Sequence, residues 1–351
     1  FVGKYSIVIT ILLMLLWIPA LYGYRNMDVY YKLDASLPEK LESVKANEEL
    51  EKNYEISSVA MILVDRNLSS KETRDMIGEI RDVEGVQFAL GLDSVVGPLV
   101  AETFLPEELT GMFESENWKL VLYSSEYAVA TDEVGEQCET ISSIIKSYDE
   151  KSMLVGEAAA TKDLIDITDR DFKVVSMVSI GAIFLLIFFV LKSVSLPVIL
   201  VVVIELAIYI NMGLAYYTGT TLPFIASICV GTIQLGATVD YAILLTNRYK
   251  VERIGGRSRK EAVKTAMEMS LNSIFASALG FFAATIGVAI YSDVDLIGSI
   301  CMLLARGALL SMVIVLTLLP SLLLLLDGLI IRTTVGMKGC RGRAGKSEPE
   351  K

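Results

Sequence analysis

The chain has 351 residues, of which 53% are hydrophobic, and its mean hydropathy is +0.54. The apolar residues gather in long blocks, which excludes an ordinary soluble protein and indicates membrane spans. The net charge of -11 is unevenly placed: residues 25–171 hold 32 acidic and 14 basic residues, and the remainder holds 10 and 17, so the two parts are expected to face different compartments.

The first predicted element is a membrane helix over Tyr5–Gly23, because a bilayer core of about 30 Å takes about 20 apolar residues in a helix. Five more blocks of this kind lie near the C-terminal end. They are Phe172–Leu191, Leu196–Tyr217, Leu222–Asn247, Leu271–Tyr291 and a last block that ends at Asp327. The sequence therefore predicts six membrane helices, arranged as one helix, an acidic insert and five helices.

The insert between the first two helices repeats one order of elements. Alternating and helical apolar spacing predicts a strand, a helix and a strand, and the same order then recurs. The predicted elements are Ser58–Val64, Ser70–Val83, Gly85–Ala89, Lys119–Ser124, Asp132–Tyr148 and Met153–Val155. Strand–helix–strand taken twice is typical of a ferredoxin-like α+β domain.

Two further segments of the insert lie outside this repeat. Leu92–Trp118 contains Gly97-Pro98 and a short candidate helix, Pro106–Phe113, and it is too long for a plain connection. We expect it to be either a functional loop or a small lid. Pro38–Lys52 is expected to be a charged, solvated helix.

The basic residues of the short loops predict the orientation. Seven lie between Asn247 and Ser270 and six lie in the tail after Asp327, whereas Tyr217–Thr221 and Tyr291–Asp295 hold none. Both termini should therefore be cytoplasmic and the insert extracytoplasmic. Residues 258–270 should form a basic amphipathic helix on anionic headgroups, and we expect no nucleic-acid partner.

Away from the span ends, the predicted spans hold three charged residues: Glu205, Asp240 and Arg306. At about 1.5 Å per residue, Asp240 lies about 10 Å and Glu205 about 12 Å from the cytoplasmic side, so the two carboxylates could share a proton. Counting back from Asp327 places Arg306 about 30 Å away, near the outer surface, where its side chain would reach headgroups or the insert.

The fourth span carries the strongest candidate site. In GTIQLGATVDYAILLTNRY, Asp240 and Tyr241 place a carboxyl beside a phenol, a pair suited to proton relay. Gln234 and Thr238 form a polar stripe with Tyr241, and small residues, Gly236 among them, leave room for a neighbouring helix. The alternative is a polar clamp that joins helices without transport. Asn211 and Asn247 are further supporting polar residues; Asn211 is expected to bond another helix.

These residues resemble a known family. One helix, an α+β domain, five helices and a Gly-x-x-x-Asp-Tyr motif, here Gly236 to Tyr241, are similar to the repeat of the resistance–nodulation–division (RND) superfamily. The motif, with Arg248-Tyr249 and the basic loop after it, resembles the MMPL (mycobacterial membrane protein large) branch, in its Firmicutes-type members. Arg306-Gly307-Ala308 is similar to the family pattern too.

The resemblance implies a secondary active transporter of the cell membrane that exports lipids or other hydrophobic compounds in exchange for protons. It also implies a second Asp-Tyr pair on a second set of six helices. The chain holds one pair, so we expect a fragment or half-transporter whose partner half lies in the same polypeptide or in a second protomer. Its expected parts are a first helix (1–24), a porter-like domain (25–171), a five-helix bundle (172–331) and a polar tail (332–351).

A non-transporting membrane accessory protein with the same fold, acting in lipid sensing or protein export, is the alternative function. An enzyme is not expected, because the chain has no histidine, no nucleophile elbow and no phosphate-binding loop. The four cysteines, at positions 138, 229, 301 and 340, have no metal-site spacing. We therefore expect neither a cofactor nor a metal.

Overall fold

The computed structural model describes residues 2–31, 38, 40–54, 58–96 and 107–337. The chain divides into two compact units, each described here by itself. The first comprises Phe1–Tyr30 and Asp171–Lys351, and the second comprises Tyr31–Arg170. The loop motif Gly97-Pro98, most of the polar tail and Cys340 lie outside the described residues.

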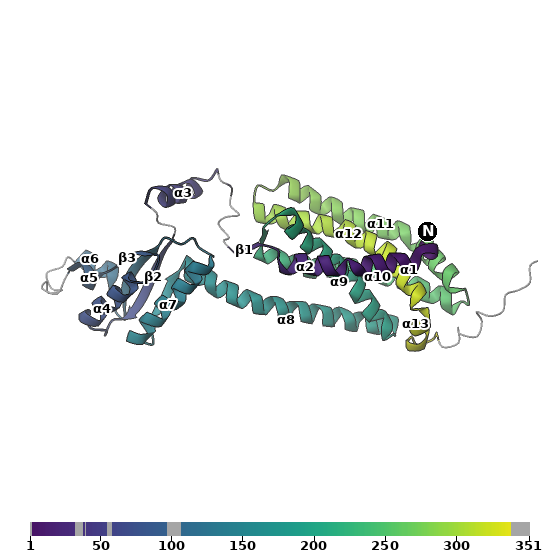
Figure 1. The fold of residues 1–351 in the computed structure, drawn as a ribbon, viewed down its shortest axis with the longest axis horizontal. Helices are drawn as coiled ribbons and strands as arrows, with labels where there is room; N and C mark the ends of the chain where they lie inside the picture. Colours follow the sequence, from purple (N-terminus) through teal and green to yellow (C-terminus); the bar gives the residue numbers. More distant parts are fainter. Residues whose placement is uncertain (1, 32–37, 39, 55–57, 97–106, 338–351) are drawn as a thin grey trace, which may run out of the picture. The chain divides into compact units, whose positions relative to one another are not determined.

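The first unit is a bundle of long helices (Figure 1). Within the described residues, six helical segments are long and apolar enough to cross a membrane, in agreement with the predicted number. The helices of this unit are α1 (Val2–Leu15), α2 (Trp17–Arg25), α8 (Glu157–Leu191), α9 (Ser195–Thr218), α10 (Phe224–Ile254), α11 (Arg259–Tyr291), α12 (Asp295–Leu325) and α13 (Asp327–Thr333). The N-terminal part of α8, up to Arg170, belongs to the second unit.

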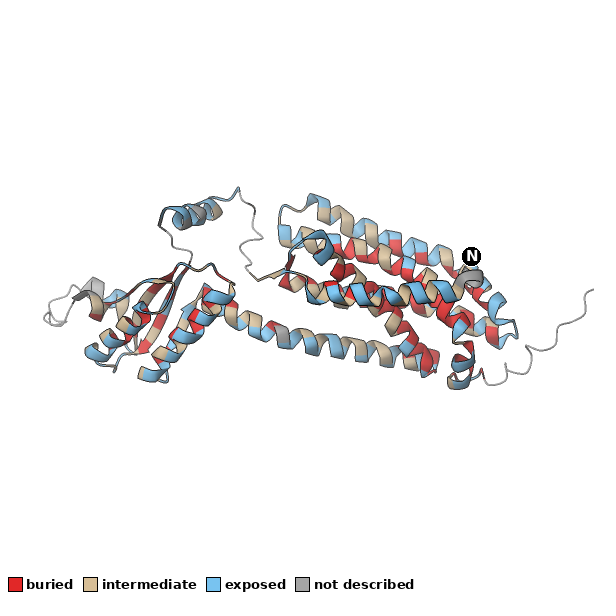
Figure 2. Ribbon diagram, in the orientation of Figure 1, coloured by how far each residue is buried: buried red, intermediate tan, exposed pale blue. Residues whose placement is uncertain are grey.

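Three of these helices form the centre of the bundle. In their most apolar stretches, 61% of the residues of α9 and 67% of those of α12 are buried, against 11% in α8 and α11 (Figure 2). Helix α10 lies between these values at 44%. The core is therefore made by α9, α10 and α12, and one face of α10 is left uncovered.

Helix α2 packs closely on α9 because glycines meet at the crossing. A Cβ on Gly23 would lie 2.6 Å from the carbonyl oxygen of Gly213, and a Cβ on Gly213 would lie 2.7 Å from the carbonyl oxygen of Ala20. Contacts of this length are with backbone and cannot be relieved by a rotamer change. Small residues thus allow close helix packing here, as they do in membrane proteins generally.

The second unit contains a four-stranded sheet in the order β3-β4-β2-β5, with every pair of neighbours antiparallel. Its helices α4 and α7 contribute apolar side chains to one core with the sheet, including Met76, Ile77, Ile141 and Ile145. The elements are α3 (Glu42–Tyr54), β2 (Ser58–Asp65), α4 (Ser70–Arg81), β3 (Val86–Gly91), α5 (Leu92–Val96), α6 (Glu107–Phe113), β4 (Trp118–Ser125), α7 (Asp132–Tyr148) and β5 (Met153–Gly156). Each strand and helix of the predicted repeat is present.

Two predictions about helices require correction. The second span is the end of a 35-residue helix, because the sequence from Glu157 onward contains no glycine or proline that would stop it before the apolar block. The basic segment before the fifth span is the first part of α11, not a separate helix on the membrane surface. Its Ala262 and Ala266 are fully buried against the bundle.

Two short strands close one end of the helical unit. β1 (Val29–Tyr30) pairs in parallel with β6 (Leu222–Pro223), which directly precedes α10. The hydroxyl of Tyr30 donates to the carboxylate of Asp295 at the start of α12. This pairing connects the chain after α2 to the beginnings of the two core helices α10 and α12.

Candidate functional site

Asp240 lies near the middle of α10, which begins at Phe224 and ends at Ile254. At about 1.5 Å per residue, Asp240 is about 24 Å from the first of these ends and about 21 Å from the second. The helix continues well past Asn247, where the apolar block was expected to end. The carboxylate therefore lies deeper within its helix than the hydropathy of the sequence predicted.

The side chain of Asp240 is exposed and, within the described part of the chain, takes part in no hydrogen bond or ion pair. Other exposed residues of α10 occur at intervals of three or four positions from Asp240, and residues at this spacing lie along one face of an α-helix. They are Ile233, Gly236, Leu244, Asn247 and Val251. An unpaired carboxylate facing lipid is costly, and in a membrane span such a group usually faces the bundle interior or a water-filled cavity.

Gly236 was expected to let a neighbouring helix approach α10 closely. In the structure, a Cβ on Gly236 would meet nothing within 4 Å, and the same holds for Gly231. The described helices of this chain therefore leave the space beside both glycines open. At Gly236 the space lies on the same exposed face as Asp240.

Tyr241 is directed into the bundle, away from Asp240. It is only 5% exposed and packs within the apolar core, since neighbouring residues on a helix point about 100° apart. The structure shows no hydrogen bond between the phenol and the Asp240 carboxylate among the described residues. Tyr241 was expected to orient the Asp240 carboxyl group by hydrogen bonding, and within the described part of this chain it does not.

A buried polar network lies on the opposite side of α10. Asn211 of α9 donates to the side-chain oxygen of Gln234 (2.9 Å) and to the carbonyl oxygen of Leu303 (2.9 Å). The amide nitrogen of Gln234 in turn donates to the hydroxyl of Ser311 (2.9 Å). The network joins α9, α10 and α12, as expected for Asn211, while the Thr238 hydroxyl donates within its own helix to the carbonyl oxygen of Gln234.

Arg306 belongs to this network, which corrects its predicted place near the outer surface. Its Nε donates to the side-chain oxygen of Asn211 (2.8 Å) and its Nη2 to the Asn211 carbonyl oxygen (2.6 Å). The prediction failed because α12 already begins at Asp295, so that Arg306 lies within the helix, and α9 offers acceptors at that depth. Asn211 then has both side-chain donors and its acceptor satisfied.

Gly307 and Ser311 are parts of the network that the sequence reasoning missed. A Cβ on Gly307 would lie 2.6 Å from the oxygen of Gln234 and 2.7 Å from the nitrogen of Asn211. Only a glycine leaves space for the two amide side chains to meet. Arg306-Gly307 stood out in the sequence, but its partners come from two other helices and no spacing within one helix identifies them.

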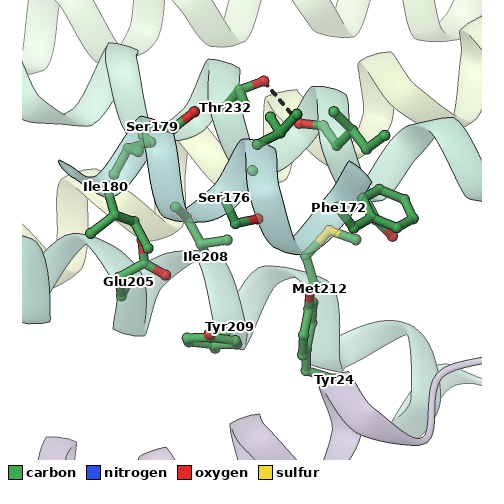
Figure 3. Close-up of a pocket in the computed structure, with 15 residues that line it drawn as sticks. Tyr24, Phe172, Ser176, Ser179, Ile180, Glu205, Ile208, Tyr209, Met212 and Thr232 are labelled. Atoms are coloured by element: carbon green, nitrogen blue, oxygen red, sulfur yellow. Dashed lines mark hydrogen bonds between the residues drawn. The ribbon is translucent and has the colours of Figure 1, made fainter. Parts of the chain in front are cut away.

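Glu205 lines a cavity of about 60 Å³ between α2, α8, α9 and α10 (Figure 3). From α10, the cavity is lined by Gly231, Thr232 and Leu235 among others, and Asp240 is not part of its lining. Asp240 follows Leu235 by five positions, which rotates it by about 140° around the helix. The structure therefore does not bring Glu205 and Asp240 together.

Comparison with known proteins identifies the family. The model of the MMPL family matches residues 35–341, most of the chain. The chain belongs to the MMPL family. It is 25% identical over 282 residues to membrane protein YdgH of Bacillus subtilis (strain 168), an alignment that covers 74% of this chain and 31% of YdgH.

The helical architecture matches a solved transporter. A crystal structure of a heavy metal efflux pump aligns with a TM-score of 0.55 and 10% identity, covering 94% of this chain and 48% of the pump. The fold of this MMPL chain is thus RND-like. The chain spans about half of the pump and less than a third of YdgH.

Proposed function

We propose that this MMPL chain is one half of an exporter of lipids or other hydrophobic compounds, driven by the proton-motive force, with Asp240 and Tyr241 at the coupling site. The observation that supports this most is the unpaired, exposed carboxylate of Asp240 in the middle of a span. In a membrane such a group is expected to face another protein surface or water, and reversible protonation is a common role for it.

The second half supplies that protein surface in this proposal. It packs on the exposed face of α10, where the open space beside Gly236 gives access to Asp240. It lies either in the same polypeptide or in a second protomer. When Asp240 gains or loses a proton, the preferred packing of the two halves changes, and the halves move against each other.

In this proposal Tyr241 acts indirectly, from the side of α10 that packs in the core. Because its ring is held in the core, it fixes the rotation of α10 and so the direction in which Asp240 points. Glu205 has no part in this relay, since it lines a separate cavity.

The insert is placed outside the cell in this proposal and acts as a porter domain. The basic residues of the loops support this orientation, with both termini in the cytoplasm and the protein in the plasma membrane. The strand order β3-β4-β2-β5 and the helices α4 and α7 support its assignment as ferredoxin-like. Membrane lipid surrounds the helical unit, and a lipidic substrate would pass through the insert.

The proposal is tested by transport or resistance assays on the full-length protein in cells with a normal proton gradient. Asp240→Asn should abolish export, because an amide cannot exchange a proton, and Tyr241→Phe should reduce it less, because the ring is retained. Val178→Ala, at a 64% exposed position of α8 away from this face, is the control and should retain export. Normal export by Asp240→Asn would show that Asp240 is not the proton relay, whereas absence of export by the wild type would favour a non-transporting accessory function.

A further inference from the structure

The cavity beside Glu205 has features that proton coupling does not explain. Figure 3 shows Glu205, Tyr209 and Ser176 among the residues that line it. Glu205 is the only charged residue among the described residues that line this cavity. Its carboxylate takes part in no hydrogen bond or ion pair within the described ranges. A carboxylate in a span is usually paired, so the cavity lacks a positive counterpart.

A second polar group in the cavity is also unsatisfied. The hydroxyl oxygen of Ser227 on α10 is buried and has no hydrogen-bond partner in the described structure. Ser176 and Ser179 of α8 add two further hydroxyl groups to the lining. The other cavity hydroxyl on α10, that of Thr232, already donates to the carbonyl oxygen of Ile228. Three serine hydroxyls and a carboxylate thus surround one small space as potential acceptors.

Aromatic rings form another wall of the cavity. Tyr24 of α2 and Tyr209 of α9 pack edge to face, with ring centroids 4.9 Å apart, and Trp17 packs on Tyr209 at 5.4 Å. Phe172 of α8 lines the cavity as well. Aromatic faces attract cations, and the attraction is strongest where water is excluded.

The α8 side of the cavity is only lightly packed. From residue 172 to residue 186 no side chain of α8 is buried, and the apolar residues that line the cavity from α8, Phe172, Val175 and Ile180, are all partly exposed. The described part of the bundle therefore leaves an apolar helix surface beside the cavity. A ligand with an alkyl chain could place its head group in the cavity and its chain along this surface.

We propose that the cavity binds the primary ammonium head of a cationic amphiphile, with Glu205 as its counter-charge and the Ser227 hydroxyl as an acceptor. An ammonium group carries three N–H donors, which suits a carboxylate and hydroxyls arranged around one point. The volume of about 60 Å³ fits a compact head of this kind, since a buried water needs only about 10–15 Å³ on the same measure. This binding property goes beyond the proposed export function and does not depend on it.

The test measures equilibrium binding of radiolabelled dodecylamine to the full-length protein in lipid nanodiscs. Dodecanol, which has the same chain and no charge, is the matched probe. We expect saturable binding of the amine and none of the alcohol. Glu205→Gln should weaken amine binding about tenfold or more, because a charge-assisted hydrogen bond is lost, and Ser227→Ala about threefold.

Two more variants separate this inference from other effects. Gly231→Leu should block binding while leaving Glu205 in place, because Gly231 lines the cavity and a Cβ there meets nothing within 4 Å. This variant also serves if Glu205→Gln does not fold. Asp240→Asn removes a carboxylate on another face of α10 and should leave amine binding unchanged, even where it abolishes export.

The results that would overturn the proposal are equally direct. Equal binding of dodecylamine by the wild type and by Glu205→Gln would show that the carboxylate does not hold the amine. Equal binding of dodecanol and dodecylamine would show that the site recognises the alkyl chain alone. Loss of export in Asp240→Asn with no amine binding in the wild type would sustain the coupling proposal and reject this one.

Discussion

Asp240 and Tyr241 are consecutive on α10, but the carboxylate of Asp240 is exposed while the ring of Tyr241 is buried in the core. The step of about 100° between neighbouring helix positions places the border of the packed bundle between these two residues. A motif that reads as one unit in the sequence is therefore divided in space. The Tyr241 ring packs in the core of the bundle, and Asp240 lies on the exposed face of α10.

The first prediction concerns the partner of this exposed face. In a cysteine-free background, Gly236→Cys should form cross-links to the second half or to a second copy when treated with a short bifunctional maleimide. The open space beside Gly236 allows close approach, so the distance to the partner should be short. Cross-linked products are identified by gel mobility and mass spectrometry.

Val178→Cys on α8 is the matched control, since this side chain is 64% exposed but lies on another helix. It should react with a lipid-soluble maleimide and form no cross-link. If Gly236→Cys behaved in the same way, the exposed face of α10 would be a lipid face, and the argument from Asp240 to a second half would fail.

The second prediction concerns the glycine at the polar network. Gly307→Ala should lower the stability of the protein in detergent, because the new methyl group would lie 2.6 Å from the oxygen of Gln234 and force it away from Asn211. Loss of a hydrogen bond between membrane helices costs about 1 to 2 kcal/mol. The measurement is the thermal unfolding midpoint.

Gly280→Ala provides the comparison for this variant. Gly280 lies within α11, and a Cβ there meets nothing within 4 Å. Alanine also has a higher helix propensity than glycine, so stability should stay equal or rise. An equal loss in both variants would contradict the specific role of the network.

The third prediction concerns pH and the insert, whose residues 31–170 form a compact unit with its own core. The Ser69 hydroxyl donates to the Glu72 carboxylate (2.7 Å) and lowers the pKa of Glu72 from its ordinary value of 4.5, with a further contribution from the Ser69 backbone N–H. A carboxylate whose pKa is lower in the folded state stabilises that state above its unfolded pKa. This stabilisation is lost as the pH falls through the folded pKa.

The expressed insert should therefore unfold at a lower temperature as the pH is reduced from 5 to 3. Glu72→Gln should be less stable than the wild type at pH 7, and this difference should shrink as the pH falls through the folded pKa of Glu72. Circular dichroism measures both midpoints. A difference that stayed constant over this range would exclude the charge of Glu72 as its cause.

The sequence predicted the strands and helices of the insert because their signals are local. Helix α7 has the predicted bounds, since Thr131 caps its first turn, with its hydroxyl accepting from the backbone N–H of Val134, and apolar residues recur at helical spacing. The number of membrane helices was predicted correctly, but the lengths of several were underestimated. Hydropathy detects the apolar block, whereas a helix such as α8 or α11 continues through polar residues until a breaker occurs.

The site was predicted only in part, for a related reason. Asp240 stood out because a carboxylate in an apolar block is visible in one segment alone. The bonds from Arg306 to Asn211 and from Asn211 to Gln234 depend on which faces of three helices meet. No periodicity within one helix determines that arrangement, so the network became visible only in three dimensions.

The last prediction concerns a buried ion pair near the C-terminal end of α10. Arg253 donates to the Asp327 carboxylate through Nε (3.0 Å) and Nη2 (2.8 Å), and the hydroxyl of Tyr249 donates to the same group. Both charged side chains are at most 10% exposed. Removal of one partner leaves the other charge buried and unpaired, which costs about 3 to 5 kcal/mol.

Asp327→Asn and Arg253→Met should therefore each destabilise the protein strongly. The double variant, with both charges removed, should be more stable than either single variant, because no unpaired charge remains. Thermal unfolding of the four proteins in the same detergent completes the double-mutant cycle. Additive losses would mean that the two side chains act independently and that this buried ion pair does not stabilise the contact between α10 and α13.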